Sequence, residues 1–204
     1  MLAKAVADGE DVQPVYVSTG LAWEHNEQAM AARFVAALSG VRPMKVLIVD
    51  MTDIYPSTHW AVRGEAPAFD TPDTDVYLEG RNVILLSKAA VYMSRNGSTR
   101  AQIGLLAGNP FPDSTPEFFE SMERALSTGL ATTISIEAPF RELMKADVIR
   151  LGEALSVPFE LTLSCMQPVG GQHCGRCSKC RERRDAFAEA GVRDPATYAS
   201  TPPR

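Results

Sequence analysis

Four cysteines within sixteen residues constrain this chain more than any other feature. They are Cys165, Cys174, Cys177 and Cys180, and the chain has no others. A Cys-x-x-Cys pair can place two sulfurs on one tetrahedral ion because the turn between them curls back, and here two overlapping pairs and an upstream cysteine supply four ligands. Such clustering indicates a metal site and not a secreted disulfide scaffold. We expect structural zinc, since four sulfurs leave no coordination position for a substrate.

An iron–sulfur cluster is the main alternative for this metal site. Cys-x-x-Cys-x-x-Cys also occurs in ferredoxins, where a fourth cysteine followed by proline comes downstream; here Arg184-Asp185 stands at that place. Four unrelated buried cysteines are a further alternative that the spacing disfavours. His173 precedes Cys174, but four sulfurs already complete a tetrahedral set, so we expect His173 not to coordinate.

Short apolar or β-branched stretches alternate with longer amphipathic ones. The expected strands are residues 12–19, 44–49, 99–104 and 132–137. The expected helices are residues 24–38, 83–95, 116–126, 145–155 and 181–190. This order predicts an α/β fold with a Rossmann-like parallel sheet, helices on both faces, and a C-terminal four-cysteine zinc knuckle over residues 164–194. The length of 204 residues predicts one domain over residues 1–204.

Ligands of parallel sheets bind beyond the carboxyl ends of the strands, which points to residues 20–23, 50–53 and 105–109. Residues 57–79 are rich in Pro, Asp and Thr and predict a long loop, which in many proteins is a lid. Before the second helix, Gly80 permits close backbone approach, Arg81 offers a planar fork for a carboxylate or phosphate, and Asn82 can cap the helix. Taken alone, this segment is best explained by helix capping and a solvated arginine.

Composition excludes some classes of function. The formal net charge of -5 argues against a surface that neutralises nucleic-acid phosphates. The basic stretch at residues 179–184 is broken by Glu182 and predicts a solvated helix face. A run of eighteen apolar residues and a signal-peptide pattern are both lacking, so we expect a cytoplasmic protein that does not enter a membrane. The tail at residues 200–204 is expected to fray.

Four motifs together resemble the 7-cyano-7-deazaguanine synthase family. They are Glu79-Gly80-Arg81-Asn82, Phe111-Pro112-Asp113 with Pro116-Glu117-Phe118, Ala138-Pro139 with Lys145-Ala146-Asp147-Val148, and the cysteines described above. Their order and spacing match the family over residues 76–194. The resemblance implies an ATP pyrophosphatase-type fold, structural zinc, a homodimer and a role in queuosine-type deazapurine biosynthesis.

The resemblance also implies a reaction and a set of site residues. In the family, ATP with magnesium adenylates the carboxylate of 7-carboxy-7-deazaguanine, ammonia gives an amide, and a second adenylation leaves the nitrile. By position, the implied nucleotide- or substrate-binding residues are Gly20, Glu24, Arg81, Asn82, Phe111, Asp113 and Glu117, the last three at the deazapurine end. Lys145 is the implied catalytic residue, reaching toward the phosphates or the carboxylate.

Two departures from the family pattern leave other functions open. The family's Ser-Gly-Gly-x-Asp-Ser loop has no counterpart and would belong immediately before Met1, so a chain without it is expected to bind ATP poorly. The family's Tyr-Gly-Gln-Arg-His is replaced near Gly20, where Trp23 is expected to change the pocket. The alternatives are a paralogous enzyme that adenylates another substrate and a non-catalytic, zinc-bearing nucleotide-binding or interaction protein.

Overall fold

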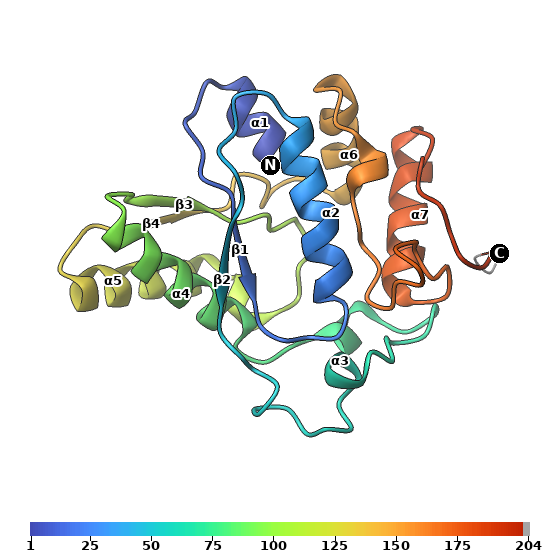
Figure 1. Ribbon diagram of the computed structural model, residues 1–204, viewed down its shortest axis with the longest axis horizontal. Coiled ribbons are helices and arrows are strands. Elements are labelled where there is room, and N and C mark those ends of the chain that lie inside the picture. The colour runs from blue at the N-terminus through green and yellow to red at the C-terminus, as the bar shows by residue number, and fades with distance from the viewer. Residues whose placement is uncertain (202–204) are drawn as a thin grey trace. The chain divides into compact units, whose positions relative to one another are not determined.

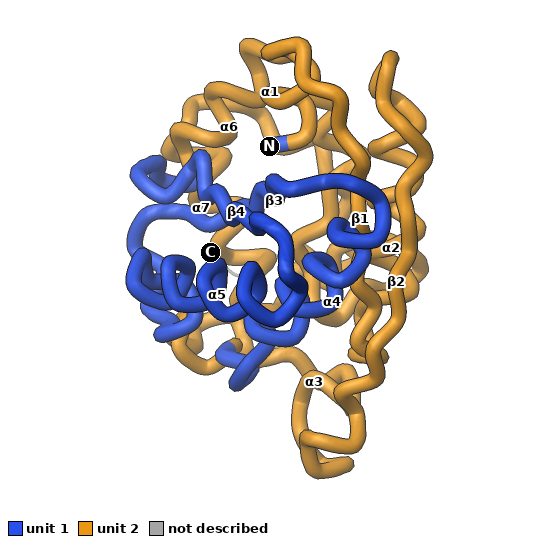
Figure 2. Tube along the Cα trace, turned by 90° about the vertical axis from the view of Figure 1, so that its left-hand side faces the viewer, with its two compact units in different colours: residues 1, 77–145 blue, residues 2–76, 146–204 orange. Residues whose placement is uncertain are grey.

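The computed structural model describes residues 1–201, which form two compact units (Figure 2). One unit consists of Met1 and residues 77–145. The other joins residues 2–76 to residues 146–201 and therefore combines segments from the early and late parts of the chain. Each unit contains one pair of parallel strands. In the described residues, no helix is both long and apolar enough to cross a bilayer.

The discontinuous unit is built on strands β1 (Val15–Ser18) and β2 (Lys45–Ile48). They pair in parallel, with Val15 opposite Lys45 and Ser18 opposite Ile48. Helix α2 (Glu24–Ala37) connects them and runs beside the pair (Figure 1). Helix α1 (Leu2–Ala7) precedes β1. Parallel pairing places the carboxyl ends of both strands at one edge, next to Gly20.

The same unit contains three helices from the later part of the chain. They are α6 (Lys145–Ala154, whose first residue belongs to the other unit), the short 3-10 helix η3 (Phe159–Leu161), and α7 (Ser178–Ala190). Buried Ile149 packs in one cluster with Ala186 and Phe187, and Phe159 meets the Phe187 ring edge-on, with centroids 5.1 Å apart. This cluster fixes α6 against α7, beside which it lies in Figure 1.

The expected long loop at residues 57–79 is shorter than predicted because it contains helix α3 (Trp60–Arg63) and 3-10 helix η1 (Asp73–Val76). His59 caps α3 by accepting a hydrogen bond from the backbone N–H of Ala61. Gly64 ends α3 in the left-handed conformation, with φ of 78°. A single turn with caps at both ends has no apolar periodicity, so the sequence pattern could not reveal it.

The continuous unit contains α4 (Arg81–Arg95), β3 (Arg100–Gln102), 3-10 helix η2 (Pro112–Ser114), α5 (Pro116–Leu130) and β4 (Ser135–Glu137). Strands β3 and β4 are parallel, with Arg100 opposite Ser135. The core of the unit lies between α4, α5 and the strands and consists of Leu86, Ala90, Met93, Leu105, Phe119, Ile134 and Ile136. Pro116 occupies the first turn of α5, where its missing N–H leaves no helical bond unmade.

The α/β class with parallel strands flanked by helices is confirmed, whereas two details of the helices differ from expectation. Helix α4 begins at Arg81 with left-handed Gly80 as its N-cap, so Asn82 lies inside the first turn and does not cap the helix. Helix α7 begins at Ser178, with Cys177 as its N-cap, three residues before the predicted start. The prediction left Ser178, Lys179 and Cys180 out of the helix because the metal-binding pattern and the first helical turn overlap there.

Candidate metal centre and ligand-binding residues

The four cysteines converge on one point. All four Sγ atoms lie within 4.8 Å of one another, and all four side chains are buried. Cys165 Sγ lies 3.9 Å from Cys177 Sγ, and Cys174 Sγ lies 3.9 Å from Cys180 Sγ. The Sγ atoms of Cys177 and Cys180 are 3.5 Å apart. A tetrahedral ion with metal–sulfur bonds of 2.3 Å requires sulfur–sulfur distances of about 3.8 Å. The cluster therefore has the dimensions to hold a single metal ion.

Backbone N–H groups point at two of these sulfurs. Cys165 Sγ accepts from the amides of Gln167 at 3.3 Å and Cys174 at 3.2 Å, and Cys174 Sγ accepts from the amide of Arg176 at 3.4 Å. Cys177 and Cys180 lie at the N-terminus of α7, where the helix dipole favours negative charge. These groups favour the thiolate forms that a metal requires.

His173 is buried next to the cysteines but outside the ligand cluster, as expected. Its Nε2 accepts a hydrogen bond of 3.2 Å from the backbone N–H of Ser164. Burial, together with the positive charge of Arg183, lowers the pKa of His173 to about 4. The ring is therefore neutral at physiological pH and orders residue 164, just before the first cysteine.

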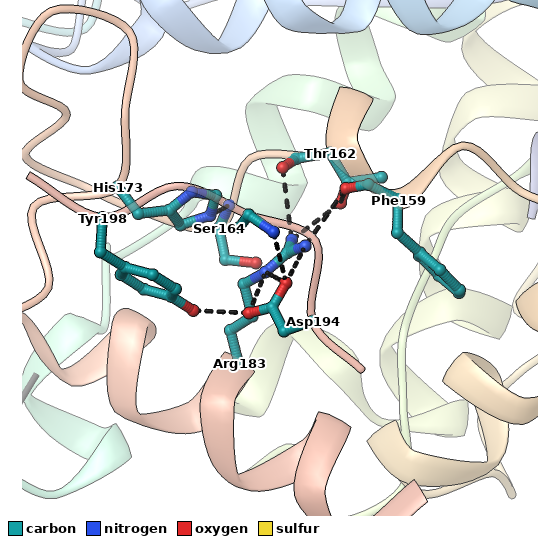
Figure 3. Close-up of polar contacts among 8 residues, drawn as sticks. Phe159, Thr162, Ser164, His173, Arg183, Asp194 and Tyr198 are labelled. Atoms are coloured by element: carbon teal, nitrogen blue, oxygen red, sulfur yellow. Dashed lines mark hydrogen bonds and ion pairs between the residues drawn. The ribbon is translucent and has the colours of Figure 1, made fainter. Parts of the chain in front are cut away.

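An ion pair between buried Arg183 and partly buried Asp194 lies close to His173 and Tyr198 (Figure 3). The guanidinium of Arg183, 4% exposed, donates to Asp194 at 2.8 and 3.1 Å and to the Thr162 hydroxyl at 2.7 Å. Tyr198 donates its hydroxyl proton to Asp194 at 2.6 Å. Burial by itself raises the pKa of Asp194, but the hydrogen bonds from Arg183 and Tyr198 lower it overall. The expected solvated face at residues 179–184 is therefore wrong for Arg183.

The segment after Asp194 covers the cysteine turn. The N–H of His173 donates to Thr197 O at 3.1 Å, and the N–H of Ala199 donates to His173 O at 2.8 Å. Ser200 Oγ donates to Cys174 O at 2.6 Å. Fraying is thus wrong for Ser200, because it bonds to the metal-binding turn; residues 202–204 lie outside the described part of the chain. We name residues 197–200 the C-terminal clamp.

Gly175 is in close contact with this clamp. Its φ of +80° is in the left-handed region, and a Cβ at this position would lie 2.1 Å from the carbonyl oxygen of Ser200. Only glycine meets both requirements without moving the clamp. The turn between Cys174 and Cys177 therefore depends on one residue without a side chain.

At the carboxyl end of β1, the side chain of Glu24 accepts hydrogen bonds from the residues just before it in the chain. Its buried carboxylate accepts from the backbone N–H groups of Thr19 at 2.8 Å and Gly20 at 3.0 Å and from the Ser18 hydroxyl at 2.8 Å. Gly20 has φ of +84°, and a Cβ there would approach Thr52 and Asp50 at about 3 Å. The structure thus brings Gly20 and Glu24 together in one rigid turn at the strand end. The carboxylate of Glu24 fixes this turn because the backbone N–H groups of Thr19 and Gly20 both donate to it.

In the continuous unit, Asn82 and Asp113 form a reciprocal pair. The N–H of Asn82 donates to Asp113 Oδ2 at 3.0 Å, and Asn82 Nδ2 donates to Asp113 O at 2.9 Å. Beside them, the rings of Phe111 and Tyr77 are stacked with centroids 5.0 Å apart. Desolvation and the negative charge of Asp113 raise the pKa of Tyr77. An aromatic pair beside a fixed carboxylate can receive a planar ring that carries N–H donors.

Three further predicted residues lie near helix starts. Arg81 opens α4, Glu117 is exposed in the first turn of α5, and partly buried Lys145 opens α6. None of these positions tests the implied roles, which stay predictions. The residues that sequence reasoning missed are Asp194, which binds Arg183, and Tyr198, which donates to Asp194. They lie 11 and 15 positions after Arg183. No local pattern links these positions, so spacing could not have revealed them.

Comparison with known proteins finds similar sequences over almost the whole chain. Residues 1–191 match the family described as queuosine biosynthesis protein QueC. A protein of Anaeromyxobacter dehalogenans, named 7-cyano-7-deazaguanine synthase, is 35% identical over 210 residues, covering 96% of this chain and 89% of its own length. Proteins of the same name from Oceanobacillus iheyensis and Thermoplasma acidophilum are 34% and 35% identical, covering 93% and 99% of this chain and 88% and 87% of their own lengths.

Proposed function

The chain belongs to the QueC family of queuosine biosynthesis proteins, and on this premise we propose that it is a 7-cyano-7-deazaguanine synthase, an ATP-dependent carbon–nitrogen ligase. The observation that carries the proposal is similarity over nearly the whole chain to proteins of that name. The substrates would be 7-carboxy-7-deazaguanine, ATP with magnesium, and ammonia.

The proposed reaction converts a poor electrophile into a good one twice. A carboxylate oxygen attacks the α-phosphate of ATP, which releases pyrophosphate and forms an acyl adenylate. Ammonia then attacks the acyl carbon and displaces AMP, giving the amide. A second ATP adenylates the amide oxygen, and loss of AMP and two protons leaves the nitrile. The protein's contribution is chiefly to orient these reactants and to stabilise negative charge.

The continuous unit offers groups suited to the deazapurine. The stacked rings of Tyr77 and Phe111 match a flat heterocycle, and the Asp113 carboxylate can accept from its ring N–H groups. Arg81 and Lys145 carry the positive charges that a phosphate or carboxylate group requires. We assign Lys145 to the reacting groups and Glu117 to the deazapurine end on the basis of family position.

We also propose that the metal is zinc. The sulfur–sulfur distances of 3.5 to 3.9 Å support one ion bound by four thiolates. An iron–sulfur cluster would place several iron and sulfide atoms between the cysteines, which requires a wider arrangement. With four sulfur ligands, zinc would supply folding energy and would take no part in the reaction.

The decisive experiment incubates the full-length gene product with ATP, magnesium, ammonia and 7-carboxy-7-deazaguanine and follows AMP and the nitrile by mass spectrometry. We expect two AMP for each nitrile formed. Lys145→Ala should abolish product formation, whereas Lys88→Ala, on an exposed part of α4, should not. If the wild-type protein released no AMP with any carboxylate tested, a non-catalytic nucleotide-binding protein would replace this proposal.

One observation bears on the second candidate, a paralogous enzyme that adenylates another substrate. The turn after β1 differs from the family pattern, and its Trp23 is 3% exposed and stacked on Trp60. This stacking supports the view that Trp23 packs inside the protein, so that the departure leaves the deazapurine site intact. AMP release with another acid, but not with 7-carboxy-7-deazaguanine, would instead favour the paralogous enzyme.

A further inference from the structure

We propose that the metal centre sets the position of the turn after β1 through residues 51–76, and that Arg181, Phe69 and Trp60 are the positioning residues of this connection. The inference deepens the proposed function and rests on it only for its kinetic readout. All of the residues involved lie in the discontinuous unit.

The first anchor of the connection is at the cysteines. Ala68 and Cys177 form an isolated antiparallel bridge, and the N–H of Ser178 donates to Pro67 O at 3.1 Å. Ala66 packs against the cysteine cluster. The backbone of residues 66–68 is therefore bonded directly to the metal-binding turn and to the start of α7.

Two arginines of α7 extend this anchor. Arg181 Nη1 donates to Phe69 O at 2.7 Å, and Arg181 Nη2 lies 3.5 Å from Asp73 Oδ1. The guanidinium of Arg184 lies over the Phe69 ring, 4.8 Å from its centroid, and Phe69 is 9% exposed. The arginines expected to form a solvated face thus hold residues 69–73 against the helix that carries the cysteines.

The second anchor is at the carboxyl end of β1. The N–H of Ala22 donates to Ala61 O at 3.0 Å. The indole rings of Trp23 and Trp60 are stacked with centroids 5.5 Å apart and planes within 10°. Trp23 precedes Glu24, whose carboxylate fixes residues 18–20. Helix α3 is therefore bonded to the turn at the carboxyl end of β1, where ligands of parallel sheets generally bind.

The two anchors are close together along the chain. Pro67 follows Ala61 by six residues, so even a fully extended chain between them spans only about 20 Å. Three of the intervening residues belong to α3 or its left-handed Gly64 C-cap, which removes most of the remaining freedom. Because the link is short and ordered, loss of the anchor at the cysteines loosens α3 and, through Trp60, the turn at Gly20.

Tryptophan emission tests this connection directly, because Trp23 and Trp60 are the only two tryptophans of the chain. We expect Arg181→Ala to retain its zinc while its emission shifts to longer wavelength and acrylamide quenching increases. Arg181→Lys should restore part of the wild-type signal because it keeps the charge near Asp73. The matched control is Arg176→Ala, which removes an exposed arginine from the metal-binding turn itself and should leave the emission unchanged.

Kinetics provides the second readout. We expect Arg181→Ala to raise KM for ATP about tenfold and to leave kcat within about twofold, because the turn is displaced but the reacting groups are kept. Phe69→Leu is a second variant that removes the ring beneath Arg184. Wild-type emission and quenching in both zinc-loaded variants would overturn the proposal. The fluorescence needs no substrate, so failure of the proposed function would appear separately, as lack of turnover in the wild-type protein.

Discussion

Replacing Gly175 by alanine is the sharpest test of the metal-binding turn. The added methyl group would lie 2.1 Å from Ser200 O, so the C-terminal clamp must move. Movement breaks the hydrogen bonds Ser200 Oγ to Cys174 O, Ala199 N to His173 O, and His173 N to Thr197 O. At about 1 kcal/mol for each bond and about 1 kcal/mol for the left-handed backbone, the expected loss of unfolding free energy is about 4 kcal/mol.

Gly171→Ala is the matched control, because Gly171 has the same φ of +80° and open space around its Cβ position. This variant isolates the backbone strain, so it should lose only about 1 kcal/mol. Urea unfolding of both variants, at equal zinc content, gives the two values. Equal losses for Gly171→Ala and Gly175→Ala would refute the reasoning, since the clamp would then contribute nothing.

Three further outcomes are expected. Arg183→Met should lower the unfolding free energy by about 3 kcal/mol in urea titrations, because the partly buried Asp194 loses its charged partner and keeps only neutral donors such as Tyr198. The ion pair stabilises the fold above the ordinary carboxyl pKa and loses its effect as pH falls through the lowered folded pKa, so NMR should show a higher pKa for Asp194 in Arg183→Met. Glu24→Gln should destabilise by about 2 kcal/mol in the same unfolding assay, because an amide NH2 then faces backbone donors. Elemental analysis should find about one zinc in each colourless chain, with loss of far-UV circular dichroism on strong chelation; iron in a brown protein would contradict this.

Local patterns in the sequence predict the elements of this fold well. All four expected strands are present, and Pro116 and the cysteine spacing correctly locate the start of α5 and the metal cluster. These features depend on residues within a few positions of one another, where periodicity and turn chemistry act. They show which segments are helices or strands, and which side chains can share an ion.

Contacts between distant segments could not be predicted in this way. Arg181 binds Phe69 O across 112 positions, and no periodicity connects those residues. The basic residues of α7 suggested a solvent-exposed face, because charged side chains are usually exposed. Arg183 is nevertheless buried, because folding brings the carboxylate of Asp194 next to it. The expectation of fraying near the C-terminus failed at Ser200 for the same reason.

The discontinuous unit also imposes an order on folding during synthesis. Residues 77–145 leave the ribosome as one uninterrupted stretch and can collapse at once, whereas residues 66–76 must wait for the cysteines and α7. About 100 residues separate the two, which at 5 to 20 residues per second is a delay of roughly 5 to 20 seconds. During that interval the nascent N-terminal segment exposes Phe69 and other apolar residues that are buried in the finished protein. Chaperone contact with the growing chain is therefore expected to concentrate on residues 2–76.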